Sequence, residues 1–184
     1  MDRALGKRNT ITKLALGSSK NYSKSAMENK DRIRFAEFYD IDSPKIDPIF
    51  LKNCKCAGIL VVDDQYINRF IIVQFCQKYN IPCDEAGDGK QAVDKIKAAA
   101  AKPCCKGYSL VLMDLNMPVM GGIEATMKII ELKDNREWPR SIKVIAVTAF
   151  ATESEKRKWY KAGMSEFIPK PFRIQEFVRL ISKS

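Results

Sequence analysis

The sequence predicts an α/β fold in which five parallel strands form one doubly wound sheet with helices on both faces, preceded by a basic N-terminal extension. Three observations support this prediction. Strand-like apolar runs alternate five times with amphipathic stretches from Gly58 onward. The run LVLM at 110–113 is apolar at every position, which is typical of a strand buried on both faces of a parallel sheet. The 184 residues, 46% of them hydrophobic, suffice for one such core and an extension.

The first half of this pattern contains two strands and two helices. Residues 59–62 are predicted to form a short buried strand that ends at Asp63 and Asp64. Residues 81–86 form the second strand, and residues 90–101 form a helix whose apolar residues recur at helical spacing. The helix between these strands is expected to face the core with Phe70, Ile71, Val73, Phe75 and Cys76.

The strand at 110–113 lies in the middle of the pattern and ends at Asp114. A loop with Pro118, Gly121 and Gly122 separates it from the next helix. That helix is expected to face the core with Ile123, Met127 and Ile130.

The last part of the pattern again alternates strand and helix. Residues 143–147 form the fourth strand, which ends at Thr148, and residues 152–162 form a charged helix. Residues 166–168 form a short fifth strand that ends near Lys170. The final helix shows apolar residues at i, i+3, i+4 and i+7, namely Ile174, Phe177, Val178 and Ile181.

Two segments follow from this assignment, a basic arm and linker over residues 1–55 and a folded domain over residues 56–184. Residues 1–24 hold six Lys or Arg side chains and one acidic residue. This composition fits a solvated tail, or an arm that binds an acidic partner such as nucleic acid, a filament or an anionic membrane. The prolines at 44 and 48 break regular structure in the linker, while its apolar residues predict that it packs on a surface.

Composition also excludes several classes of protein. No apolar run approaches the roughly twenty residues that a membrane helix needs, and the N-terminus lacks the apolar block of a secretion signal. We therefore expect an intracellular, cytoplasmic protein without a membrane span, either free or bound through its arm to a cytoskeletal or other large assembly. The chain contains no histidine, so it cannot use imidazole as a general base, a metal ligand or a phosphoryl carrier.

Polar residues follow four of the five predicted strands at their carboxyl ends: Asp63, Asp64, Asp114, Thr148 and Lys170. The carboxyl ends of parallel strands meet at one edge of the sheet, where ligands bind in open α/β folds. Three carboxylates at this edge would repel one another, so the site needs a cation, and hard oxygen ligands favour Mg2+.

The chemistry that this set suits is phosphoryl transfer to a carboxylate. Lys170 adds a fixed positive charge, and the Thr148 hydroxyl can donate a hydrogen bond to an anion held on Asp114. Such a transfer depends on in-line positioning and charge neutralisation more than on a general base. Each residue also has a simpler interpretation, since the aspartates could cap a helix and the other two could be surface groups.

Four blocks of the sequence, VVDDQYINR, LVLMDLNMPVMGG, VIAVTA and EFIPKPF, occur in this order. Together they closely resemble the signature blocks of the receiver domain of two-component response regulators, particularly the receivers of hybrid sensor kinases. The resemblance covers roughly residues 57–184 and implies a flavodoxin-like fold.

The resemblance implies a role for each pocket residue. Asp114 would be the phosphoacceptor, and Asp63, Asp64 and Asp114 would bind Mg2+ together with the backbone carbonyl of Asn116. Lys170 and Thr148 would contact the phosphoryl oxygens.

The resemblance also implies a switch. Phe167 matches the position of the family's switch aromatic, which moves inward when Thr148 turns toward the phosphoryl group. It further implies a cis peptide bond between Lys170 and Pro171. The bulky Phe150 stands where attacking water would pass, which predicts slow loss of the phosphoryl group.

Two hypotheses for the function remain. The first is a stand-alone response regulator receiver that takes its phosphoryl group from a histidine kinase or a histidine phosphotransfer protein and then changes a protein-binding face. The second is a structural or scaffold subunit that uses the receiver fold for docking, with its basic arm on an acidic assembly. Neither needs an independent enzyme, and we expect the output to pass through protein contact and not through a DNA-binding or kinase domain.

Overall fold

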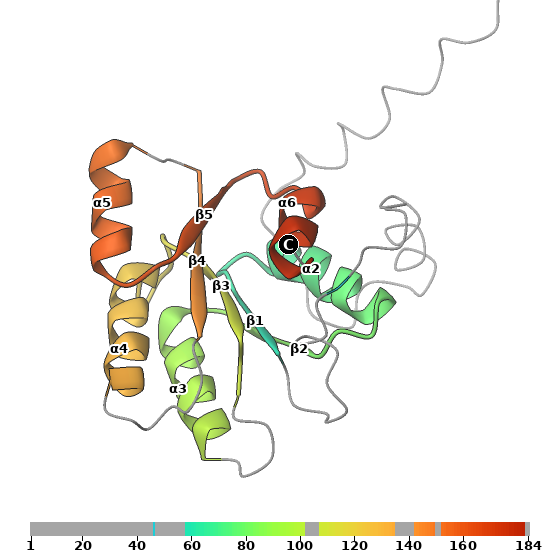
Figure 1. The fold of residues 1–184 in the computed structure, drawn as a ribbon, viewed down its shortest axis with the longest axis horizontal. Helices are drawn as coiled ribbons and strands as arrows, with labels where there is room; N and C mark the ends of the chain where they lie inside the picture. Colours follow the sequence, from blue (N-terminus) through green and yellow to red (C-terminus); the bar gives the residue numbers. More distant parts are fainter. Residues whose placement is uncertain (1–45, 47–57, 102–106, 135–141, 150–151, 183–184) are drawn as a thin grey trace, which may run out of the picture.

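The computed structural model describes residues 46, 58–101, 107–134, 142–149 and 152–182. Within these residues, five parallel strands form one sheet in the order β2-β1-β3-β4-β5 (Figure 1). The strands are β1 (Ile59–Val62), β2 (Cys83–Ala86), β3 (Leu110–Asp114), β4 (Lys143–Thr148) and β5 (Glu166–Pro169). The structure confirms the predicted five-stranded parallel sheet.

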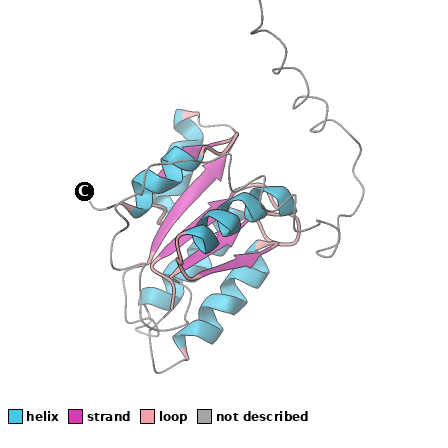
Figure 2. Cartoon of the chain, turned by 90° about the vertical axis from the view of Figure 1, so that its right-hand side faces the viewer, coloured by secondary structure: helices cyan, strands magenta, loops and turns pink. Residues whose placement is uncertain are grey.

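The described helices cover both faces of the sheet, as Figures 1 and 2 show. Helices α2 (Tyr66–Lys78) and α6 (Ile174–Ile181) pack on one face. The other face carries α3 (Gly89–Ala100), α4 (Gly122–Asp134) and α5 (Glu153–Lys161). None of these helices combines the length and the apolar character that crossing a membrane requires.

The two central strands β1 and β3 supply the core on both faces of the sheet. Leu60 and Val62 face the cluster under α3, α4 and α5, whereas Ile59 and Val61 face the cluster under α2 and α6. All five residues of β3 are buried. The continuous apolar runs of the sequence therefore arise because each successive side chain meets a different helical layer.

Two helices face the core with some residues that were not predicted. In α2, Phe70, Phe75 and Cys76 are buried as predicted, but the structure also buries Ile72, while Ile71 and Val73 are half-buried. In α4 the buried side chains include Ala125 and Ile129, four residues apart on one face, and Met127 is 58% exposed. The prediction favoured large apolar residues, but the small Ala125 is fully buried and lies against Gly89 at the start of α3, where a Cβ added to the glycine would be 2.8 Å from that of Ala125.

The second strand starts later than predicted, at Cys83, because of the proline before it. Pro82 has no N–H to donate to a strand ladder, although its carbonyl accepts from the N–H of Gly58 at 2.9 Å. Ile81 is still buried beside the sheet. The other predicted boundaries agree with the structure to within about one residue.

Ile46 is the described residue of the N-terminal extension. It forms an isolated antiparallel bridge with Ser182, just after α6, and it packs against the apolar cluster of α2 and α6. The rest of the extension, including the basic arm of residues 1–24, lies outside the described residues. The binding role expected of that arm therefore stays a prediction.

Candidate functional site

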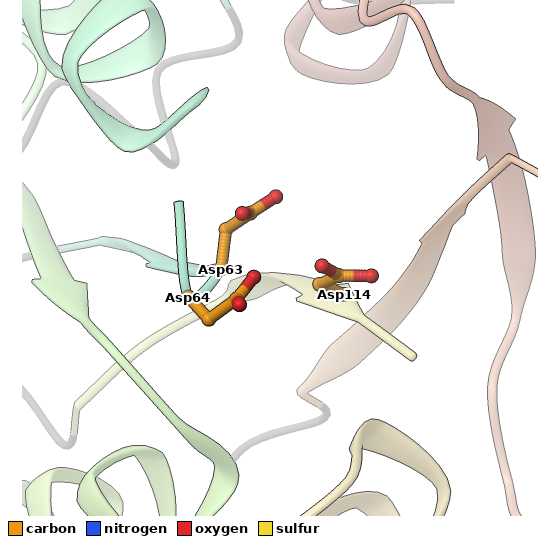
Figure 3. A group of neighbouring side chains, drawn as sticks. All are labelled: Asp63, Asp64 and Asp114. Carbon is orange, nitrogen blue, oxygen red and sulfur yellow. The ribbon is translucent and has the colours of Figure 1, made fainter. Parts of the chain in front are cut away.

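Three carboxylates gather at the carboxyl edge of the sheet (Figure 3). Asp63 and Asp64 follow β1, and Asp114 is the last residue of the neighbouring strand β3, because Val62 pairs with Met113. One carboxylate oxygen from each residue lies within 4.8 Å of the others. Asp63 and Asp114 are buried, each about 4% exposed. The adjacency of two strands thus brings together acidic residues that are 50 positions apart.

The Lys170 ammonium lies between two of these carboxylates. Its Nζ is 2.6 Å from Oδ2 of Asp114 and 2.8 Å from Oδ2 of Asp63. The lysine follows β5, and its backbone N–H donates to the carbonyl of Thr148 at 2.7 Å, which joins the ends of β4 and β5. The peptide bond between Lys170 and Pro171 is cis, as the resemblance implies.

The chain fits closely beneath Asp114. The N–H of Asn116 donates to Oδ1 of Asp114 at 3.2 Å. Gly122, at the start of α4, lies so close that a Cβ at this position would collide with the carbonyl oxygen of Asp114. A larger residue at position 122 would therefore displace the strand end that carries the carboxylate.

The two predicted switch residues lie on β4 and β5. Thr148 ends β4 and is 3% exposed. Phe167 is half-buried in β5, with its ring 5.8 Å from the ring of Trp159 in α5 and 5.2 Å from Nζ of Lys156. Phe150 lies outside the described residues, so the slow loss of the phosphoryl group that it predicts is still a prediction.

Asp63 accepts several hydrogen bonds that sequence reasoning missed. The N–H of Gln65 donates to Oδ1 at 2.9 Å, and Nδ2 of Asn68 lies 3.0 Å from both Oδ1 and Oδ2. Arg69 donates from one terminal nitrogen to the backbone carbonyl of Asp63 at 2.6 Å. These residues stand in the same sequence block as the aspartates, but the sequence does not show which side chains turn back toward Asp63.

Burial and charge shift the pKa values of Asp114 and Lys170 in opposite directions. Burial raises the pKa of the Asp114 carboxyl above its ordinary value, although the hydrogen bond and charge of Lys170 act to lower it. Burial lowers the pKa of the Lys170 ammonium, but its hydrogen bonds to Asp114 and Asp63 outweigh burial, and the net shift is upward. The site therefore holds a charged lysine beside a carboxylate that is costly to ionise.

This shift predicts how pH affects stability. Because the pKa of Asp114 is higher in the folded protein than in the unfolded chain, its contribution to stability is complete at low pH and is lost as the pH rises through the folded pKa. Asp114→Asn removes this titration. In metal-free buffer we expect the free energy of unfolding of Asp114→Asn, relative to wild type, to increase between about pH 4 and about pH 7.

Urea unfolding of both proteins at the two pH values measures this difference. Asp94→Asn is the matched control, because Asp94 is exposed on α3 and pairs there with Lys90. A relative stability of Asp114→Asn that stays constant or decreases between the two pH values would contradict the prediction.

The donor set of the site fits a small divalent cation. Three carboxylates within 4.8 Å of one another provide hard oxygen ligands, which Mg2+ prefers over nitrogen or sulfur. A divalent cation here would relieve the repulsion between ionised groups that Lys170 alone only partly offsets.

The sequence and the fold both match known proteins. The family model of the response regulator receiver domain matches residues 59–182. The chain is 37% identical over 134 residues to the autoinducer 2 sensor kinase/phosphatase LuxQ of Vibrio vulnificus, which covers 73% of this chain and 14% of that protein. It is 35% identical over 126 residues to two-component response regulator 24 of Arabidopsis thaliana, covering 67% of this chain and 81% of that protein.

Two solved structures are similar to this chain. One is the co-crystal of the Saccharomyces cerevisiae histidine phosphotransfer signaling protein Ypd1 with the receiver domain of Ssk1, at 29% identity and a TM-score of 0.60, covering 68% of this chain and 86% of that one. The other is the receiver domain of the Arabidopsis thaliana histidine kinase CKI1 with Mg2+ and BeF3-, at 26% identity and a TM-score of 0.57, covering 67% of this chain and 87% of that one.

Proposed function

This chain belongs to the response regulator receiver domain family of two-component phosphorelays, and we propose that it accepts a phosphoryl group on Asp114 with Mg2+ bound beside it. One observation carries the proposal. The buried Asp114 carboxylate lies 2.6 Å from the Lys170 ammonium and next to Asp63 and Asp64, at the carboxyl edge of the sheet. This combination offers a nucleophilic oxygen, a fixed cation and a set of metal ligands at one point.

The donor in this proposal is a phosphohistidine on a histidine kinase or a histidine phosphotransfer protein. The sequence contains no histidine, so the donor imidazole must come from outside it. The solved complex of a similar receiver domain with a phosphotransfer protein supports this type of partner.

In the proposed reaction, a carboxylate oxygen of Asp114 attacks the phosphorus atom, and the bond between phosphorus and the imidazole nitrogen breaks. The electron pair of that bond stays on the nitrogen, and Asp114 becomes an acyl phosphate. Lys170 would pair with the phosphoryl oxygens, and Asp63, Asp64, Asp114 and the backbone carbonyl of Asn116 would hold Mg2+. When bound, Mg2+ supplies positive charge that offsets the negative charge developing on the phosphoryl oxygens.

The proposed output is a change in a protein-binding face. Thr148, buried at the end of β4, would donate its hydroxyl to the phosphoryl group, and Phe167 would move in the direction that Thr148 vacates. Phe167 contacts Trp159 of α5, so its movement would alter the surface formed by α5, β5 and α6. Beyond forming and losing its own acyl phosphate, the domain needs no enzymatic activity for this role.

Intact mass after incubation with acetyl phosphate tests the proposal. We expect the wild-type protein to gain one phosphoryl group in the presence of Mg2+ and essentially none in EDTA, because Lys170 alone cannot offset three carboxylates and an incoming anion. The gain should disappear in mild alkali, which hydrolyses acyl phosphates. No gain from acetyl phosphate or from a phosphorylated phosphotransfer protein, with a known receiver as positive control, would refute the proposal.

A further inference from the structure

Two polar side chains from the first two turns of α2, those of Asn68 and Arg69, point back toward the loop that carries Asp63 and Asp64. Asn68 donates from Nδ2 to both oxygens of the Asp63 carboxylate, each at 3.0 Å. The N–H of Gln65 and the Lys170 ammonium also donate to this carboxylate, at 2.9 and 2.8 Å. Three neighbouring groups therefore hold the Asp63 carboxylate in place.

Arg69 supports the same loop from its other side. One terminal nitrogen of its guanidinium donates to the backbone carbonyls of Asp63 and Asp64, at 2.6 and 3.3 Å. Its Nε is 3.3 Å from Oε2 of Glu85 on the edge strand β2. The Arg69 side chain is 15% exposed, and its guanidinium lies 5.8 Å from the ring of Tyr66. One half-buried cation therefore links the acidic loop, the edge of the sheet and the start of α2.

We propose that Asn68 and Arg69 are positioning residues for the cation site, which hold the loop of Asp63 and Asp64 in its binding geometry before the cation arrives. The inference rests on the function proposed above and assigns a role to residues that touch neither the cation nor the phosphoryl group.

The physical reason is the repulsion that the loop must withstand. Asp63, Asp64 and Asp114 lie within 4.8 Å of one another, and without a bound cation their mutual repulsion favours moving the loop away from β3. Asn68 opposes this by fixing the carboxylate of Asp63, and Arg69 opposes it by fixing the backbone. Groups behind metal ligands commonly contribute about ten- to a hundredfold to metal affinity in this way.

Two variants separate these contributions. Asn68→Leu keeps the size of the side chain and removes its donors. Arg69→Lys keeps the charge, but a single ammonium cannot replace the guanidinium that spans two carbonyls and Glu85. Gln77→Leu is the matched control, because Gln77 is exposed on the last turn of α2, away from the acidic loop.

Two measurements apply to each variant. The first is the exchange rate of the Gln65 amide hydrogen in the metal-free protein, since this N–H donates to Asp63 and reports on the loop. The second is the dissociation constant for Mg2+ alone. The amide of Leu112 in the central strand serves as the measure of global stability.

We expect Asn68→Leu to weaken Mg2+ binding about tenfold and Arg69→Lys to weaken it by about threefold or more, with faster exchange at Gln65 and unchanged exchange at Leu112. Gln77→Leu should match wild type. Unchanged exchange at Gln65, or Mg2+ affinities within about twofold of wild type in both variants, would overturn the inference.

The two proposals can fail separately. A wild-type protein that binds no Mg2+ would refute the function proposed above. In that case the Gln65 amide still decides whether Asn68 and Arg69 hold the loop, because its exchange is measured without metal.

Discussion

Asp114→Asn will gain no phosphoryl group from acetyl phosphate or from a phosphorylated phosphotransfer protein, under conditions in which wild type gains one. An amide oxygen carries no negative charge and is a far weaker nucleophile than a carboxylate. The substitution keeps the shape of the side chain, and its oxygen can still accept from Asn116 and Lys170. The loss will therefore reflect missing chemistry and not a collapsed pocket. Intact mass with Mg2+ present measures the outcome.

Asp94→Asn is the matched control for this experiment. Asp94 is more than half exposed on α3, paired with Lys90 and far along the chain from the acidic loop. The Asp94→Asn protein should gain one phosphoryl group at the wild-type rate. Uptake by Asp114→Asn that equals this control would mean that the phosphoryl group attaches elsewhere, and the assignment of Asp114 would be wrong.

Lys170→Met is expected to damage both transfer and stability. The methionine keeps most of the length of the side chain but leaves Asp63 and Asp114, whose side chains are each 5% exposed, without their shared cation. Removing one partner of a buried ion pair costs about 3 kcal/mol, and removing one donor to a developing oxyanion slows a reaction by about a hundredfold or more. We expect losses of this size in the free energy of unfolding at neutral pH and in the rate of phosphoryl uptake.

Urea unfolding in EDTA and intact mass over time measure the two effects. Lys90→Met provides the comparison, since Lys90 forms an ion pair with Asp94 on the exposed face of α3. This substitution should leave the free energy of unfolding and the rate of phosphoryl uptake unchanged. Adding Mg2+ should restore part of the stability of Lys170→Met, because a ligand that binds the folded state stabilises it. If Lys170→Met is as stable as Lys90→Met and takes up the phosphoryl group as fast, Lys170 has neither role.

The fold could be predicted from the sequence largely because apolar runs alternate with amphipathic stretches and polar residues follow four of the five strands. The apolar run of β1 ends at Asp63 and that of β3 includes Asp114 as its final residue, as predicted. The core face of α4 could not be predicted in the same way. Met127 has the larger apolar surface, but Ala125 and Ile129 are buried, and the close contact of Ala125 with Gly89 of α3 requires a small residue that periodicity alone does not mark.

The candidate site could likewise be predicted only in part. Asp63, Asp64, Asp114, Thr148 and Lys170 could be placed together because parallel strands share their carboxyl edge. The roles of Asn68 and Arg69 depend on which rotamers turn back toward the loop, and the contact between Arg69 and Glu85 spans 16 residues. Helical spacing alone does not determine such contacts, so they required the structure.

The position of Trp159 beside Phe167 offers a way to observe the switch. Its indole lies 5.8 Å from the ring of Phe167, and the emission of an indole depends on its immediate surroundings. The domain therefore contains a natural fluorophore next to the residue whose displacement would transmit the signal. The sequence has two tryptophans, so replacing Trp138 with phenylalanine would leave Trp159 as the sole source of emission. Activation could then be followed optically in real time, without a label and without knowledge of the downstream partner.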